Sequence, residues 1–146
     1  RSVREAARSA DVVVVYLHWG VQGEACPSDG QRRLAARLVA AGADVVAGSH
    51  AHRLQGDGRL GPGYVAYGLG NYAWYTPSAE ATGVLTLPVR PAAAPAGRAR
   101  VTQAVWAPAR IGGRGLPEPL AGADVVRFRE RLADLRECAG FAPSGR

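Results

Sequence analysis

Apolar residues in the first third of the chain predict a strand, a helix and a second strand. Residues 12–17 and 44–47 are short apolar runs of the kind that favours strands buried on both faces. Between these runs, one apolar stripe at helical spacing comprises Leu34, Ala35, Leu38 and Val39. Ser28 and Gln31 have the spacing of a capping box, and Gly42 is a helix stop signal. This order of elements is typical of an α/β fold with a parallel sheet.

The rest of the chain predicts further strands, connecting loops and a terminal helix. Strands are expected at residues 64–67, 72–75, 84–89 and 100–111, the last at a sheet edge because it contains Pro108. Loops or turns are expected at residues 55–63, 68–71, 91–98 and 112–119, of which 91–98 is a low-complexity turn or linker. The predicted final helix, residues 124–138, has an apolar stripe of Val125, Phe128, Leu132 and Leu135.

Composition indicates one folded domain, since 47% of the 146 residues are hydrophobic and 21% are charged. The formal net charge of +6 raises the question of nucleic-acid binding. All eighteen basic residues are arginine, however, and they are scattered along the chain among acidic residues, so we expect no nucleic-acid partner. No apolar run approaches the roughly 20 residues of a membrane span. The chain opens within an apparent helix, residues 2–10, which predicts a fragment or a processed product of a longer protein.

All three histidines lie where the predicted strands end. His18 follows the first apolar run, and His50 and His52 follow the second. The carboxyl ends of neighbouring parallel strands share one edge of a sheet, and this edge is where ligands bind. We therefore expect the three imidazoles to converge, with ring nitrogens close enough to bind one metal ion or two adjacent ions. The alternative is a structural, hydrogen-bonding role for each histidine.

Three blocks of sequence together resemble the carboxyl-terminal half of the CapA family. The blocks are His-Trp-Gly at residues 18–20, the segment 42–52 that ends in Ser-His-Ala-His, and Tyr-Gly-Leu-Gly-Asn-Tyr at residues 67–72. CapA proteins act in capsule or poly-γ-glutamate synthesis and have a calcineurin-like metallophosphatase fold. The resemblance implies that the chain is part of an α-β-β-α sandwich and the carboxyl-terminal portion of a larger CapA-like domain.

The resemblance also implies two divalent metal ions, Mn, Zn or Fe, at the strand ends. His18 and His50 would bind one ion and His52 the other. The carboxylate and amide ligands of such enzymes belong to the amino-terminal half, which is expected upstream of this chain. Three imidazoles alone would suffice for a single zinc-like ion with an open position, whereas a two-metal site requires carboxylates. We therefore expect the 146-residue chain by itself to be inactive.

Other residues in and near the matched blocks are candidates for the site. The catalytic candidates are His18, Gln22 and Glu24. Many family members carry Glu where this chain has Gln22, and an amide cannot act as a base, so Gln22 would only orient water or substrate and Glu24 is the candidate substitute. Three further residues are expected to bind substrate or shape the site: Trp19, Gly20 and Asn71. Trp19 is expected to form a wall of the cleft, and the segment containing Asn71 to be architectural.

By this resemblance, the expected function is metal-assisted hydrolysis or transfer at a phosphoryl or amide centre during synthesis of a bacterial cell-surface polymer. The expected partners are that polymer or its precursor and, through the upstream part, membrane-associated capsule synthesis proteins. The alternative belongs to a different class: a catalytically inert module that binds or assembles the polymer at the cell surface. Both hypotheses, the metal-dependent enzyme and the inert module, predict an extracellular or cell-surface location.

Cys26 and Cys138 are the two cysteines, and their spacing matches no metal-binding knuckle. Cys26 precedes the capped helix, and Cys138 lies on the apolar side of the terminal helix. We expect a disulfide between them, which would imply an oxidising compartment. Two unrelated buried thiols are the alternative.

Overall fold

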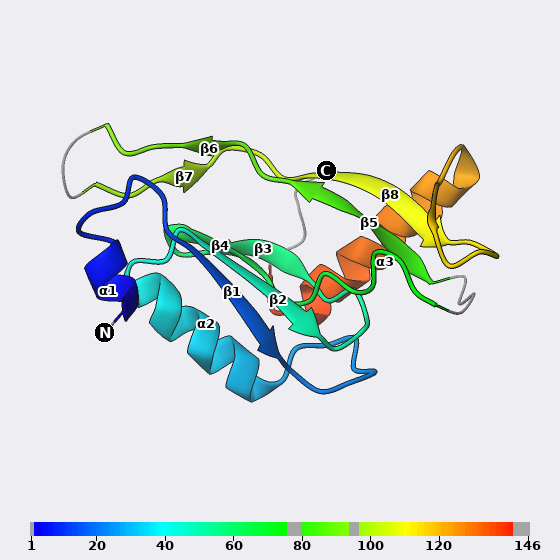
Figure 1. Ribbon diagram of the computed structural model, residues 1–146, viewed down its shortest axis with the longest axis horizontal. Helices are drawn as coiled ribbons and strands as arrows, with labels where there is room; N and C mark the ends of the chain where they lie inside the picture. Colours follow the sequence, from blue (N-terminus) through cyan, green and yellow to red (C-terminus); the bar gives the residue numbers. More distant parts are fainter. Residues whose placement is uncertain (1, 76–79, 94–96, 142–146) are drawn as a thin grey trace.

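A four-stranded sheet is the centre of the computed structural model of this protein (Figure 1). The structure describes residues 2–75, 80–93 and 97–141. Strands β1 (Val14–Trp19), β2 (Val45–His50) and β4 (Gly63–Ala66) are parallel, and β3 (Asp57–Leu60) is antiparallel to β4. The order across the sheet is β1-β2-β4-β3. The predicted strand–helix–strand unit and the α/β class are therefore confirmed.

Helix α2 (Asp29–Ala41) connects β1 to β2 and covers one face of this sheet. Its amino end has the predicted capping box, because the backbone N–H of Gln31 donates to Ser28 Oγ while Gln31 Oε1 accepts from the backbone of Ser28. Gly42 ends the helix with a φ of 119°. Four buried residues form the centre of the contact between helix and sheet: Ala35, Val39, Val46 and Val65. Leu34 is exposed, so the buried stripe is narrower than predicted.

A bent two-stranded ribbon covers the opposite face of the sheet, over β2 and β4 (Figure 1). One half pairs β5 (Ala81–Thr86) with β8 (Val105–Ile111), and the other pairs β6 (Val89–Arg90) with β7 (Arg100–Val101). The buried contact includes Val45, Tyr64 and Val101. Helix α2, the sheet and the ribbon thus supply three layers of the expected α-β-β-α sandwich. The short β9 (Pro117–Pro119) pairs with the outer side of β8.

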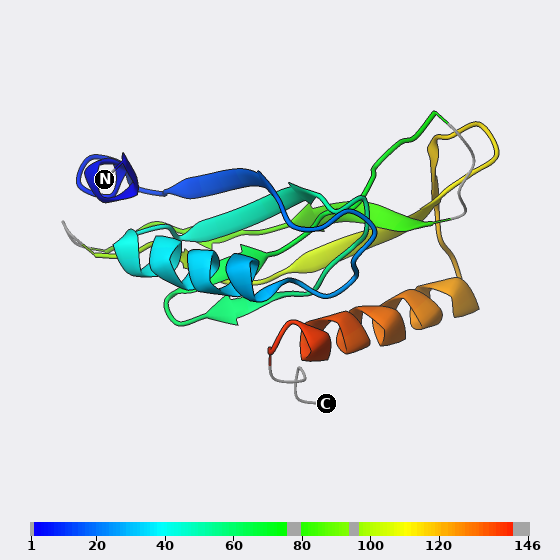
Figure 2. The ribbon, with the colours of Figure 1, turned by 90° about the horizontal axis from the view of Figure 1, so that it is seen from below.

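Helix α3 (Ala123–Cys138) lies on the same side of the strands as α2 (Figure 2). Its buried residues Phe128, Leu132 and Leu135 pack against Leu54 and against Trp106 of β8. The predicted stripe is thus largely confirmed, although Val125 is only half-buried. At the other end of the molecule, α1 (Ser2–Ala6) is shorter than the helix expected over residues 2–10. Among the described helices, none combines the length and the apolar character that crossing a bilayer requires.

Strand β1 differs from its prediction, because it is buried on one face and not on both. Its residues alternate between exposed and half-buried, and the side chains of Val14 and Tyr16 are 60% and 64% exposed. The half-buried residues Val15 and Leu17 pack on the α2 side. The reason is position: β1 is at the end of the strand order, and the ribbon covers only β2 and β4.

Two expected loops contain strands. Residues 55–63 include β3, which pairs with β4 in a hairpin that turns at Gly61 and Pro62. Residues 112–119 end in β9. In the other direction, the segment 72–75, expected to be extended, has no strand. The predicted linker at 91–98 connects β6 to β7 as the end of a hairpin, and its residues 94–96 lie outside the described residues.

The predicted strand over residues 100–111 is two strands, β7 and β8, and the edge position predicted from Pro108 is wrong. Strand β8 is the central strand between β5 and β9. The carbonyl of Pro108 accepts from the backbone N–H of Leu120, so the backbone polar groups of Pro108 face the β9 side, where β9 has already ended. The missing N–H of proline therefore removes no hydrogen bond to β5.

Candidate functional site

His18 and His50 lie together where β1 and β2 end. The parallel register pairs His18 with Ser49 and Trp19 with His50. The ring centroids of His18 and His50 are 4.5 Å apart. Strand alternation alone would place His50 on the face of Trp19, opposite His18. The φ of His50 is 96°, in the left-handed region, and this departure from strand geometry accompanies the meeting of the two rings.

His52 follows two residues later and is held by Asn71. The φ of His52 is 55°, which is also in the left-handed region, and its ring centroid is 6.3 Å from that of His50. His52 Nδ1 is 2.7 Å from Asn71 Oδ1. An amide oxygen can only accept, so Nδ1 carries the proton and the lone pair of His52 is on Nε2. This is the arrangement by which a neighbouring group orients an imidazole for metal binding.

A hollow of about 240 Å³ lies beside His52. Its lining comprises Gln22, Gly23, His52, Arg53, Asn71, Trp74 and Glu80. The Trp74 ring centroid is 4.9 Å from that of His52, so Trp74 forms an aromatic wall there, a role that the sequence pattern does not predict. We call the strand ends that carry His18, His50 and His52 the histidine edge. Gln22 lies next to it, as its place in the family motif suggests. Glu24 is not among the lining residues; it is exposed, and its backbone carbonyl accepts from Gln55 Nε2.

Trp19 and Gly20 support the site from its core side. The indole N–H of Trp19 donates to the carbonyl of Tyr67 at 2.8 Å, and the two rings stack with centroids 5.9 Å apart. Burial raises the pKa of Tyr67, so this ring is a neutral, apolar support. Gly20 has a φ of 95°, and a Cβ there would lie 2.9 Å from Gln31 Nε2. Both residues pack toward the core, which supports a shaping role.

Two buried glutamines hold the loop that carries Gln22. Gln31, whose oxygen already completes the helix cap, donates from Nε2 to Gln55 Oε1 at 3.0 Å. Gln55 in turn donates to the carbonyls of Glu24 and Cys26. Gln55 is 1% exposed, although the sequence places it in an expected glycine-rich loop. No local pattern identifies it, because its partners are more than twenty residues away.

The same loop is joined to the end of α3 by a disulfide between Cys26 and Cys138, whose Cα atoms are 5.7 Å apart. Arg32 of α2 also donates to the carbonyl of Cys138 at 2.7 Å. The expected pairing of the cysteines is thus present in the structure. It connects the segment after His18 to a helix 112 residues farther along the chain.

The histidines supply part of a metal-binding donor set. Imidazole nitrogens suit the expected ions, and the orientation of His52 by Asn71 fits a ligand role. The His50 ring, however, has the His18 ring on one side and the His52 ring on the other, so the three rings do not meet at one point. In the part of the chain that is described, no group of three or more His, Cys, Asp or Glu residues is placed to hold an ion alone. Glu80, a carboxylate at the hollow, forms an ion pair with Arg53 at 2.9 Å. A complete site would therefore need ligands in addition to the described ones.

Residues 1–75, just over half of the chain, match the family model of the bacterial capsule synthesis protein PGA_cap. The chain belongs to this family. The match includes His18, His50, His52 and Asn71, and α3 lies beyond it. Membership in the PGA_cap family confirms the expected CapA relationship and supports a metallophosphatase-like fold.

Two curated relatives of this PGA_cap chain also carry capsule-related names. The chain is 39% identical over 72 residues to the PGA biosynthesis protein CapA of Bacillus subtilis (strain 168), which is 49% of this chain and 19% of the relative. It is 42% identical over 66 residues to the capsule biosynthesis protein CapA of Bacillus anthracis, which is 45% of this chain and 16% of the relative. The matched region thus spans less than a fifth of either relative.

Proposed function

We propose that the histidine edge is part of a divalent-metal centre, and that the protein acts by metal-assisted hydrolysis or transfer at a phosphoryl or amide group during synthesis of a capsule polymer. The observation that carries this proposal is the meeting of His18 and His50 at the paired strand ends, with His52 oriented by Asn71. The capsule-related names of the relatives support the polymer context.

In this proposal, His18 and His50 bind one ion and His52 binds the other, through the Nε2 lone pair that Asn71 leaves free. A bound divalent ion would supply Lewis-acid chemistry toward the substrate and a water molecule. Asn71 fixes the ring orientation of His52, and Trp74 forms an aromatic wall of the hollow beside that ring. The Gln22 amide can donate and accept hydrogen bonds and so orient a substrate, but it cannot remove a proton.

An inert polymer-binding module is the second candidate. It is favoured by the amide of Gln22 at the hollow beside His52, since an amide cannot act as a base, and by the incomplete donor set of the described residues. In that case the family fold would present a surface for the polymer, and the histidines would have structural roles. The two candidates make different predictions about bound metal.

Metal analysis of the purified protein together with its natural flanking sequence separates the candidates. We expect two divalent ions per molecule, and expect the variants His18→Ala, His50→Ala and His52→Ala each to lose metal. Gln103→Ala, at an exposed polar residue between β7 and β8, is the control and should keep both ions. Absence of bound metal after loading with Mn, Zn or Fe would refute the metal centre and favour the inert module.

We also propose that the protein works outside the cytoplasm, at the bacterial cell surface, beside membrane-associated capsule synthesis proteins. The Cys26–Cys138 disulfide supports an oxidising compartment. Thiol titration of protein taken from its native compartment under non-reducing conditions tests this location. Two free thiols per molecule would contradict it.

A further inference from the structure

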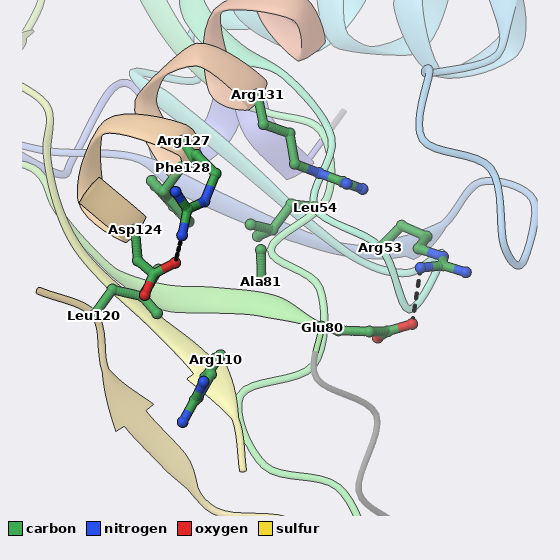
Figure 3. Close-up of a pocket in the computed structure, with 10 residues that line it drawn as sticks. All are labelled: Arg53, Leu54, Glu80, Ala81, Arg110, Leu120, Asp124, Arg127, Phe128 and Arg131. Carbon is green, nitrogen blue, oxygen red and sulfur yellow. Dashed lines mark hydrogen bonds and ion pairs between the residues drawn. The ribbon is translucent and has the colours of Figure 1, made fainter. Parts of the chain in front are cut away.

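Each of the three residues that follow His52 is held by a different part of the molecule. Arg53 forms the ion pair with Glu80, and Leu54 packs among the buried residues of α3 (Figure 3). The side chain of Gln55 reaches the loop after β1, residues 20–28. The segment that carries the proposed metal ligands is therefore anchored directly after His52.

The backbone at His50 and His52 requires such anchoring. Both residues have a positive φ, 96° and 55°, although neither is glycine. This conformation is unfavourable for residues with side chains and persists only where surrounding contacts hold it. The peptide between the two histidines is held by the loop after β1, because the backbone N–H of Gly23 donates to the carbonyl of Ala51 at 2.8 Å. The loop therefore supports the conformation in which the His18 and His50 rings meet.

Gln55 in turn holds this loop. Its Nε2 donates to the carbonyls of Glu24 and Cys26, at 3.0 and 3.4 Å, and its Oε1 accepts from Gln31 Nε2 at 3.0 Å. Its backbone N–H donates to the carbonyl of Gly68 at 2.9 Å. One buried residue thus connects the loop after β1, helix α2 and the segment after β4.

Two glycines provide the room for the pair of Gln31 and Gln55. A Cβ at Gly20 would lie 2.9 Å from Gln31 Nε2, and a Cβ at Gly68 would lie 2.9 Å from Gln55 Cγ. Gly68 is not among the glycines with a positive φ, so a close approach, and not a turn, explains the absence of a side chain there. The two amides therefore pack against the backbone just beyond β1 and just beyond β4.

An amide at position 55 meets all the polar requirements of its surroundings. The carbonyls of Glu24 and Cys26 need donors, whereas Gln31 Nε2 needs an acceptor. A carboxylate would place an oxygen without a proton against the two carbonyls. An apolar side chain would leave the carbonyls and the Gln31 N–H without partners, which is costly because Gln31 and Gln55 are only 3% and 1% exposed.

We propose that Gln55 is a positioning residue for the histidine edge. Its amide holds the loop after β1, and the Gly23 N–H of that loop holds the backbone between His50 and His52 in the conformation that presents their rings to metal. This inference rests on the proposed function, because the rings are taken to be metal ligands. Gln55 itself touches neither metal nor substrate.

The test is zinc titration of the protein with its natural flanking sequence, together with the NMR resonance of the Gly23 amide in the metal-free state. Gln55→Met keeps the approximate shape and removes the polar atoms, so we expect it to weaken zinc binding about tenfold and to shift the Gly23 resonance. Leu132→Ala is the matched control, because it destabilises the fold from the buried α3 contact. The folded control should bind zinc within about twofold of the wild type and keep the Gly23 resonance in place.

Gln31→Glu is a second variant that avoids a loss of folding. It keeps the oxygen that accepts from Ser28, so α2 remains capped, and it removes the N–H that Gln55 accepts. We expect zinc binding to weaken roughly fivefold. The added negative charge alone would strengthen the binding of a cation, so weaker binding reports the lost hydrogen bond.

Two results would overturn the positioning role: zinc affinity of Gln55→Met within twofold of the wild type, or equal weakening by Gln55→Met and Leu132→Ala. If the wild type binds no zinc, the proposed metal centre fails, and the Gly23 resonance decides the role of Gln55 separately. An unchanged resonance in Gln55→Met then overturns that role, and a shifted one that Leu132→Ala does not reproduce supports it.

Discussion

Arg136 of α3 donates from Nε and Nη2 to the carboxylate of Asp57 in β3, at 2.8 and 3.3 Å, although the two residues are 79 positions apart. The Asp57 carboxylate also accepts from the Tyr64 hydroxyl and from the indole N–H of Trp106, and Asp57 is completely buried. Burial lowers the pKa of Arg136, but the hydrogen bonds and the charge of Asp57 outweigh it and raise this pKa overall. One carboxylate thus connects the central sheet, the ribbon and α3.

Replacing Arg136 by Ala should destabilise the protein by about 3 kcal/mol, because Asp57 would remain buried without its cation. Urea unfolding at pH 7 measures the change in the free energy of unfolding. Arg129→Ala, at an exposed arginine of the same helix, is the control and should lie within about 0.5 kcal/mol of the wild type. Equal effects of the two substitutions would contradict the central role of the Asp57 carboxylate.

Stability should decrease at alkaline pH because of Tyr64. Burial first, and then the charge of Asp57 and the hydrogen bond to it, raise the pKa of Tyr64 well above the ordinary tyrosine value of 10.0. The folded protein therefore holds this proton more tightly than the unfolded chain, so the contribution is complete below pH 10 and is lost progressively as the pH rises above it. The urea midpoint should fall between pH 9 and 11 more steeply for the wild type than for Tyr64→Phe. Identical pH dependence of the two proteins would count against this explanation.

Gly48 in β2 should not tolerate a side chain. A Cβ at this position would lie 2.0 Å from Trp19 Nε1 and 2.2 Å from the carbonyl of Tyr67, and would separate this hydrogen-bonded pair. We expect Gly48→Ala to cost about 3 kcal/mol in the free energy of unfolding and to shift the fluorescence of Trp19. Gly113→Ala is the control, because a Cβ at Gly113 would have no neighbour within 4 Å. A Gly48→Ala variant as stable as the control would mean that the packing behind the histidine edge is loose.

Removing the disulfide should destabilise the protein by about 2–5 kcal/mol, since the bond closes a long loop in the unfolded chain. The paired variant Cys26→Ser/Cys138→Ser, compared with the oxidised wild type by thermal unfolding, measures this effect. Reductant should lower the midpoint of the wild type and leave that of the variant unchanged. A midpoint insensitive to reductant in both proteins would show that the bond adds no stability.

Asn71 should influence metal affinity without binding the metal. In the proposed centre, Asn71→Ala releases the His52 ring and should weaken divalent-ion binding about tenfold or more. Asn71→Asp keeps an oxygen acceptor and should retain most of the affinity. Titration with zinc, monitored by calorimetry, distinguishes the two variants. Equal affinities of the Ala and Asp variants would exclude orientation of His52 by this side chain.

The sequence predicted correctly those elements that depend on residues close together in the chain. The capping box at Ser28, the stop at Gly42 and the strand–helix–strand unit depend on residues within a few positions of one another. The meeting of His18 and His50 also followed from sequence, because parallel strands bring their carboxyl ends to the same edge. The metal and catalytic roles assigned to these residues remain predictions.

Other features depend on partners that are distant in sequence, and the pattern alone did not identify them. The exposure of Val14 and Tyr16 depends on how far the ribbon extends over the sheet, which an apolar run does not encode. Asp57 lies in a glycine-rich segment that resembles a loop, and its burial is explained by Arg136 on the final helix. Trp74 contacts His52 from a segment without helix or strand, so no hydrophobic periodicity in the sequence indicates where its side chain lies.

The outer edge of β1 has a consequence for the behaviour of the protein in concentrated solution. Within the described residues β1 has β2 on one side and no strand on the other, and its exposed face carries Val14 and Tyr16. Such an edge is a template onto which a strand of another copy can add, and an apolar surface beside it favours that addition. A partner strand or loop over this edge would therefore also protect the protein against aggregation, and Val14→Lys would protect it in the same way through charge.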